Sequence, residues 1–189
     1  MNTPAHLLIG GAAFGRAGRK GTTAAAFLGA LAPDLSLYVM VAVSIWVLGI
    51  SPQHVFDTLY YSDAWQSVFA VDNSFILWGA GLAFAIWRRW PVVIAFTAAG
   101  LLHLALDFPL HTHDARMHFW PVTDWVFESP VSYWDSGAHA NIVGPVAWAI
   151  SAGACMWLWR EHRAWAIRVL AVVLLAFETA SGGVWRFVF

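Results

Sequence analysis

The sequence places a histidine and a carboxylate on one face of an apolar helix. His103 and Asp107 are four residues apart within the apolar run that begins at Pro91, and residues at that spacing are neighbours on a helix surface. An imidazole nitrogen and a carboxylate oxygen can share one divalent metal ion, and zinc is the first candidate for these ligand types. The pair therefore predicts a metal site. A hydrogen-bonded structural pair between helices is the alternative.

Two further residues are predicted to lie at the depth of His103. Asp34 and His103 each follow the start of an apolar run by 12 residues, which at ~1.5 Å per residue places both roughly 18 Å from one end of their helices. His6 precedes a basic turn by ten residues, or roughly 15 Å by the same measure. We therefore expect His6 and Asp34 to complete the ligand set begun by His103 and Asp107.

A second group of polar residues follows Asp107 and is expected at the outer face of the membrane. Residues 111–114 read His-Thr-His-Asp, and in an extended chain His111 and His113 can reach one metal ion. We predict His113 as a ligand and His111 as a general base or orienting group, with a polar interfacial loop as the alternative. Asp72 precedes another apolar run and is the second predicted catalytic residue, unless it only caps that helix.

The composition is that of an integral membrane protein. The 189 residues are 60% hydrophobic and 11% charged, and the mean hydropathy is +0.63. An average soluble domain is about one-quarter charged, so these few charges cannot cover a soluble domain of this size. The 13 Trp residues fit a membrane interface. A net charge of −1 without a basic tract excludes nucleic acid as a partner and leaves membrane lipids.

The hydrophobic runs predict an all-α fold, a polytopic membrane helix bundle that forms a single domain over residues 1–189. A spanning helix needs about 20 mostly apolar residues. Four to five transmembrane helices are expected, at about 22–50, 73–88, 91–110, 137–159 and 164–182. The last is the weakest because it carries Arg168 and Glu178. Residues 4–15 are too few to cross and are predicted to form an N-terminal half-helix.

Lysine and arginine fall in alternate connections of this arrangement. They cluster after the half-helix, between the second and third spans, and between the fourth and fifth. The loops 51–72 and 111–136 are acidic, and Arg116 is their single basic residue. Basic loops are usually cytoplasmic. We therefore expect a multi-pass protein of the bacterial inner (cytoplasmic) membrane, with loops 51–72 and 111–136 in the periplasm.

Four short motifs occur in a recognisable order: PAHLLIG at 4–10, GALAPD at 29–34, HLALD at 103–107 and WP at 120–121. Their order and spacing resemble those of the small inner-membrane metal-dependent hydrolases of the LexA-regulated type. That family is distantly similar to zinc-dependent phospholipase C enzymes, which also use an HxxxD pair. The resemblance implies a divalent-metal site with His6, Asp34, His103 and Asp107 as ligands. It also implies a phosphoester or lipid-like substrate.

Two departures from the family pattern leave another interpretation open. The family continues its Pro-Asp with a further Asp and His, where this chain has Leu35 and Ser36. It also carries a His-Arg-Gly element before the second span, where residues 72–74 read Asp-Asn-Ser. Either residues 111–114 compensate for the missing ligands, or the chain is a non-catalytic membrane subunit or assembly factor. The second interpretation implies protein partners in a larger membrane complex.

Overall fold

The computed structural model describes the backbone of residues 1–188 and the side chains of residues 1–181. Phe189, the last residue of the predicted domain 1–189, lies outside the described residues. Within the described backbone every regular element is helical, which confirms the all-α prediction. The α-helices are α1 (Thr3–Phe14), α2 (Thr22–Ala42), α3 (Pro52–His54), α4 (Asp63–Asp72), α5 (Phe75–Trp87), α6 (Pro91–Asp107), α7 (Ala140–Glu161) and α8 (Trp165–Val188). Three short helical turns complete the set: η1 (Val43–Val47), η2 (Val55–Leu59) and η3 (Ser136–Ala138).

Three helical segments are long and apolar enough to cross a membrane. They are α2 continued by η1, α4 continued by α5, and α7, at Thr22–Val47, Asp63–Trp87 and Ala140–Glu161. Only 22–28% of the most apolar window in each segment is buried inside the protein. Their apolar side chains therefore face outward, as lipid-exposed helices require. The remaining apolar helix, α6, has 17 residues.

The second candidate span begins earlier than the sequence predicted. The expected segment was 73–88, whereas the helical run starts with α4 at Asp63. Asn73 and Ser74 interrupt the run, and the Ser74 hydroxyl accepts a hydrogen bond from the backbone N–H of Leu77 at 3.1 Å. Ser74 is thus the N-cap of α5. Asp72, for which capping was the alternative role, ends α4 instead.

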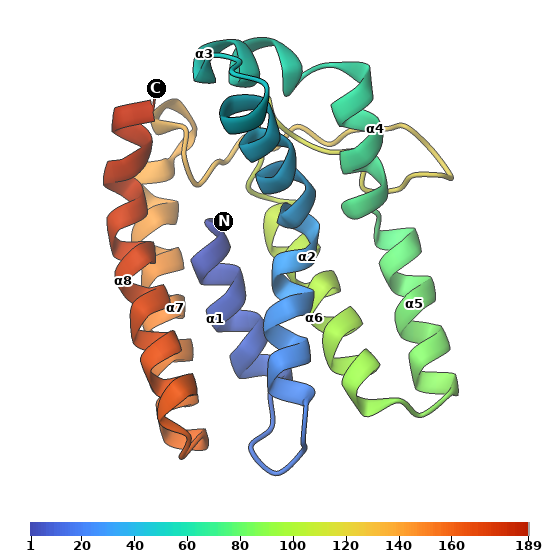
Figure 1. Cartoon of the computed structure of the whole chain (residues 1–189), viewed down its shortest axis with the longest axis vertical. Coiled ribbons are helices and arrows are strands. Elements are labelled where there is room, and N and C mark those ends of the chain that lie inside the picture. Colours follow the sequence, from blue (N-terminus) through green and yellow to red (C-terminus); the bar gives the residue numbers. More distant parts are fainter. Residues whose placement is uncertain (189) are drawn as a thin grey trace.

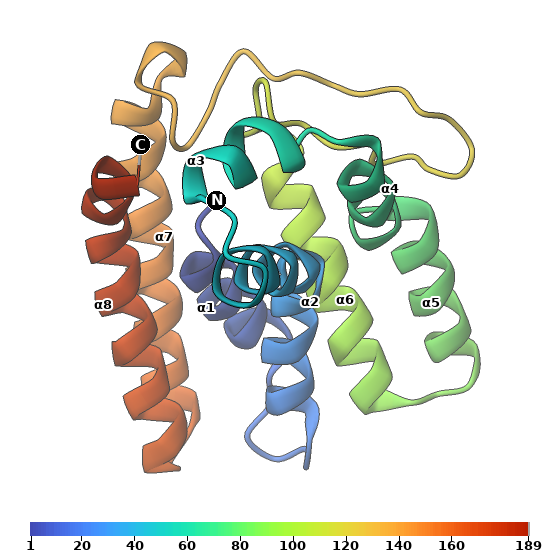
Figure 2. The same cartoon turned by 45° about the horizontal axis from the view of Figure 1, so that its top comes forward.

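The short helix α1 lies inside the bundle, where it packs against α2, α6, α7 and α8 (Figure 1). The connections α1–α2, α5–α6 and α7–α8 lie together at the lower end of this view. These are the connections that carry the basic residues. The acidic segments, comprising α3, α4 and the long connection from α6 to α7, lie at the opposite end (Figure 2). The alternation of charge along the sequence thus becomes a separation of charge between the two ends.

Glycine and alanine let α1, α2 and α6 approach closely. A Cβ atom added to Gly10 of α1 would lie 2.7 Å from the Cβ of Ala30 in α2. A Cβ added to Gly29 of α2 would lie 2.0 Å from the backbone carbonyl oxygen of Phe96 in α6. Small residues at such crossings allow helix backbones to meet without intervening side chains. This close approach brings the polar side chains of the three helices within reach of one another.

Candidate metal centre

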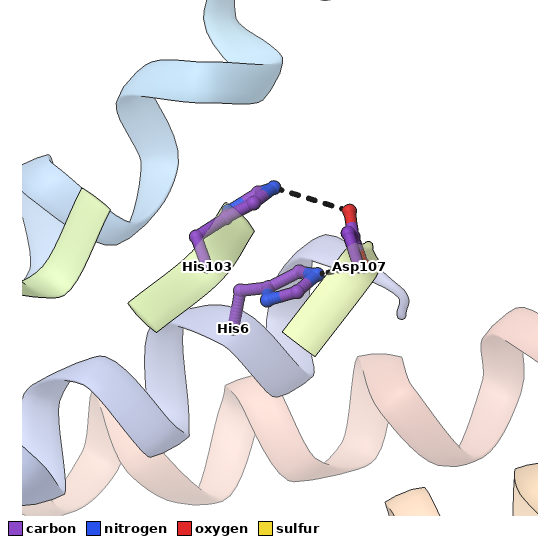
Figure 3. A group of neighbouring side chains, drawn as sticks. All are labelled: His6, His103 and Asp107. Carbon is purple, nitrogen blue, oxygen red and sulfur yellow. Dashed lines mark hydrogen bonds and ion pairs between the residues drawn. The ribbon is translucent and has the colours of Figure 1, made fainter. Parts of the chain in front are cut away.

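Three buried side chains from α1 and α6 form one cluster, the histidine–aspartate cluster of His6, His103 and Asp107 (Figure 3). The Nε2 atom of His6 lies 2.8 Å from Oδ1 of Asp107, and Nε2 of His103 lies 3.3 Å from Oδ2. Each residue offers a ligand atom within 4.8 Å of the other two. Both imidazoles are 1% exposed. Sequence spacing predicted all three as ligands, and helix packing brings them together.

Asp34 and His111 each contact one member of the cluster. Oδ1 of Asp34 lies 3.5 Å from Nε2 of His103, so α2 contributes its predicted carboxylate. Nε2 of His111 lies 3.3 Å from Oδ2 of Asp107. The hydroxyl of Thr3 donates a hydrogen bond of 2.5 Å to Asp34, which fixes that carboxylate. Asp34 and His111 therefore surround the three-residue cluster and orient its members.

Two of the imidazoles are held through their Nδ1 atoms. Nδ1 of His103 donates to the carbonyl oxygen of Ala30 at 2.7 Å. Nδ1 of His111 lies 2.9 Å from Oδ2 of Asp114. A histidine that binds a metal usually donates its other ring N–H to a carbonyl or a carboxylate, because this bond fixes the tautomer and the ring plane. Both rings therefore present Nε2 toward Asp107.

The environment of His103 fits a divalent cation. Its Nε2 atom is buried without a hydrogen-bond partner, yet it lies 3.3 and 3.5 Å from oxygens of Asp107 and Asp34. Two ligands about 2.1 Å from a tetrahedral zinc ion are separated by about 3.4 Å. Two carboxylates at this depth require a compensating positive charge. The α-amino group of Met1 pairs with Oδ1 of Asp107, and a metal ion with these ligands would add positive charge that Asp34 shares.

The stacking of His6 on His103 indicates that at least one of the two imidazoles is uncharged. The rings of His6 and His103 lie 3.7 Å apart with an angle of 13° between their planes. Two imidazolium ions in that arrangement would repel each other. At least one ring is therefore neutral, which is the state that a metal ion requires. With Asp107, the two rings give three protein ligands, the number that catalytic zinc sites use while keeping one position open.

Charged side chains in and beside the loop after α6 surround His111. Burial alone lowers the pKa of His111, but the carboxylates of Asp107 and Asp114 outweigh it and raise the pKa above its ordinary value. Burial alone raises the pKa of Asp114, but the hydrogen bond from His111 and the charges of His111 and Arg116 hold it below the usual range. Asp114 is therefore ionised at neutral pH and fixes the orientation of His111.

Sequence reasoning missed one aromatic residue of this region. The ring of Tyr133 meets that of His111 edge to face at 5.4 Å. Burial and the negative charges of Asp107, Asp114 and Asp34 raise the pKa of Tyr133 well above its ordinary value. Its hydroxyl therefore stays protonated and can donate a hydrogen bond. No spacing in the sequence pointed to it, because it follows His111 by 22 residues of irregular chain.

Two predicted site residues lie elsewhere. Residues 112–114 form a bend and a turn, so His113 is exposed while His111 is buried. The prediction of His113 as a ligand assumed an extended chain, and His113 is not among the clustered side chains. Asp72 lies beside Ser36 of α2 and is not among the side chains that form the cluster. Its predicted catalytic role gains no support from this position.

Comparisons of the chain with family models, with curated proteins and with solved structures find no match. The resemblance carried by the four short motifs therefore stays a prediction. The case for a function rests on the geometry of the histidine–aspartate cluster and of the residues around it.

Proposed function

We propose that this chain is a membrane-bound, metal-dependent hydrolase of a phosphoester or lipid-like substrate. The observation that carries the proposal is the setting of His103. Its Nδ1–H is committed to the Ala30 carbonyl, and its buried Nε2 faces the carboxylates of Asp34 and Asp107. A structural pair needs one carboxylate, whereas this nitrogen has two, with a second imidazole stacked on its ring.

The residues divide into three roles. His6, His103 and Asp107 would hold the ion, with zinc as the first candidate, and Asp34 orients His103 from the side. When bound, such an ion lowers the pKa of a coordinated water to near 7 and so makes hydroxide available at neutral pH. His111, fixed by Asp114, is placed to orient Asp107. Of the two roles predicted for His111, general base or orienting group, this assignment keeps the second.

The ring of Tyr133 packs edge to face against that of His111, and its hydroxyl is a hydrogen-bond donor. Because it stays protonated beside three carboxylates, it is suited to donate a hydrogen bond to a substrate oxygen on which negative charge develops. The sequence alone offered no donor of this kind.

The proposal includes a membrane arrangement. The three candidate spans, together with α6 and α8, give five crossings, and α1 is enclosed without crossing. Twelve helical residues cover about 18 Å, well short of the ~30 Å hydrocarbon core. The basic connections would face the cytoplasm. The connection from α6 to α7, with His111 and Tyr133, would then face the periplasm, and substrate would enter from that side or from the lipid.

Metal content tests the proposal directly. The detergent-purified chain and a His103→Ala/Asp107→Ala double variant are analysed by elemental mass spectrometry. A His54→Ala/Asp57→Ala variant is the matched control, because it removes the same residue types from an exposed turn. We expect near-stoichiometric zinc, manganese or iron in the wild type and the control, and its loss from the double variant.

Two results would refute this assignment. One is equal metal content in all three folded proteins. The other is a folded wild type that carries no metal and takes up none when zinc is added. The second result would favour a non-catalytic membrane subunit or assembly factor. If metal is present, hydrolysis of phosphoesters and short-chain phospholipids is measured with the same three proteins.

A further inference from the structure

Arg116 is a buried cation in the loop after α6. The residue is 8% exposed. Its guanidinium carbon lies 4.7 Å from the ring centroid of Tyr60 and 4.1 Å from that of Phe69. Its Nη2 atom donates a hydrogen bond of 2.5 Å to the Tyr60 hydroxyl. The two aromatic rings thus hold the guanidinium plane in place, and they come from the segment before α4 and from α4 itself.

This guanidinium lacks a direct counter-ion in the described part of the chain. None of the ion pairs formed by the side chains of residues 1–181 includes Arg116. Its Nη1 atom is buried and has no hydrogen-bond partner. A buried charge is costly unless it is paired and hydrogen-bonded. The free edge of this guanidinium is therefore a place for an anion.

Two other unpartnered atoms lie in the same turn of chain. Oγ1 of Thr112 and Oδ1 of Asp114 are also buried without hydrogen-bond partners. Buried polar atoms are normally satisfied, so three such atoms within five residues indicate a missing group. Arg116 offers donors, Asp114 offers an acceptor, and a hydroxyl can act as either. The missing group must accept from Arg116 and donate to Asp114.

The turn is joined to the histidine–aspartate cluster. Oδ2 of Asp114 accepts from His111, and His111 contacts Asp107. A group held by Arg116 and Oδ1 of Asp114 would therefore lie on the side of His111 that faces away from the α6 carboxylate. A phosphoryl group held there is bound beside the cluster and is not the group that the reacting water attacks.

We propose that Arg116 binds the phosphoryl group of a phosphate monoester, with Asp114 accepting a hydrogen bond from its P–OH. A guanidinium matches two phosphoryl oxygens with two parallel N–H donors. A singly protonated phosphoryl group also carries the P–OH that Asp114 requires. A phosphodiester carries no such proton, and neither does sulfate at neutral pH. The inference rests on the proposed hydrolase function and adds to its substrate a terminal phosphate monoester, held apart from the bond that is cleaved.

Binding of inorganic phosphate to the full-length chain in detergent tests the inference by isothermal titration calorimetry. Arg116→Gln is compared with Arg116→Lys, which keeps the charge but not the planar fork. The matched control is Arg88→Gln, because Arg88 also stacks on aromatic rings, those of Trp87 and Trp90, but beside the α5–α6 connection. We expect Arg116→Gln to weaken phosphate binding by about 10- to 100-fold. We expect Arg116→Lys to weaken it by roughly tenfold and the control to bind as the wild type does. Sulfate should bind the wild type at least about tenfold more weakly than phosphate.

Metal content is measured on the same samples to separate this inference from the proposed function. If phosphate binding depends on Arg116 but the wild type holds no metal, the proposed hydrolase function is refuted and the anion site at Arg116 stands. If metal is retained and both folded Arg116 variants bind phosphate as tightly as the wild type, the anion site is refuted and the proposed hydrolase function stands. If Arg116→Gln does not fold, wild-type affinity in Arg116→Lys overturns the inference. Equal affinities for sulfate and phosphate overturn the role of Asp114.

Two ligands with the same phosphate headgroup show whether the bound monoester is a membrane lipid or a soluble molecule. Glycerol 3-phosphate is soluble, whereas dihexanoyl phosphatidic acid carries two short acyl chains. Tighter binding of the acylated ligand, lost in Arg116→Gln, assigns the site to a membrane lipid. Equal binding of both ligands assigns it to a soluble monoester.

Discussion

Replacement of His111 by alanine should weaken metal binding without abolishing it. His111 contacts Asp107 at 3.3 Å and is held by Asp114 at 2.9 Å, so it orients a ligand and is not itself one of the three clustered ligands. Replacement of His113, two residues away and exposed, should leave metal affinity unchanged. The two histidines are therefore a matched pair within one turn of chain.

The expected loss of metal affinity in His111→Ala follows from the contact of His111 with the metal ligand Asp107. Loss of a side chain that hydrogen-bonds to a metal ligand typically lowers metal affinity by about 10- to 100-fold, which corresponds to about 1.4–2.7 kcal/mol. The same range is expected for the net contribution of one hydrogen bond to a charged group. His103→Ala removes a ligand atom and should exceed this range. Asp114→Asn keeps the shape of the side chain but not its charge, and its loss of metal affinity should lie at the lower end of the 10- to 100-fold range.

The assay is competition for zinc between each detergent-purified variant and a chromophoric chelator, with thermal unfolding recorded for every sample. The expected order of affinity is wild type equal to His113→Ala, then Asp114→Asn, then His111→Ala, and last His103→Ala. Wild-type affinity in His111→Ala would show that Asp107 needs no support from the loop. An equal loss in His113→Ala and His111→Ala would show that the loop acts only through its fold. Either result would refute the reasoning.

Two further predictions concern stability. Burial lowers the pKa of His118 to about 4, from 6.5, so the unfolded chain takes up this proton first and stability is lost as the pH falls from about 6.5 toward 4. The loss amounts to about 3 kcal/mol. His118→Phe should therefore flatten the pH dependence of thermal unfolding, as followed by tryptophan fluorescence, and an unchanged slope would contradict this. Gly29→Ala should destabilise the protein by at least about 1–3 kcal/mol, because the added Cβ would meet the Phe96 backbone at 2.0 Å. Gly144→Ala, with nothing within 4 Å of the added Cβ, should be neutral or stabilise by up to about 1 kcal/mol, and similar melting temperatures for both variants would refute the contrast.

The fold could be predicted where the sequence is regular. A helix advances by a constant rise per residue, so counting from the ends of apolar runs placed Asp34 and His103 at one depth. The i, i+4 spacing placed His103 and Asp107 on one face. The start of the second candidate span was missed because α4 is amphipathic and carries Asp63 and Asp72, so its hydropathy does not match that of a lipid-facing helix.

The site could be predicted only where helices carry it. The separation of His113 from His111 predicts a shared ligand role only in an extended chain, but residues 112–114 form a bend and a turn, and His113 is exposed. Tyr133 reaches His111 because the long connection before α7 returns across the end of α6, and no periodicity encodes such a path. Arg116 left one signal, since it is the single basic residue in the two acidic loops. A lone arginine of this kind bears on orientation in the membrane and does not by itself predict binding.

The residues of the candidate metal centre are synthesised before the two helices that cover α1. The cluster residues, with Asp34, His111 and Asp114, all precede α7 in the chain. In the described part of the chain, the extensive contacts of α7 and α8 with other α-helices are those with each other and with α1. During synthesis α1 is therefore made first and covered last, and until then only α2 and α6 hold it. Before the α7–α8 hairpin is inserted, the donor set lies against a helix, α1, that is still open to lipid on one side. Metal loading during biogenesis would thus have a window that closes when the α7–α8 hairpin inserts.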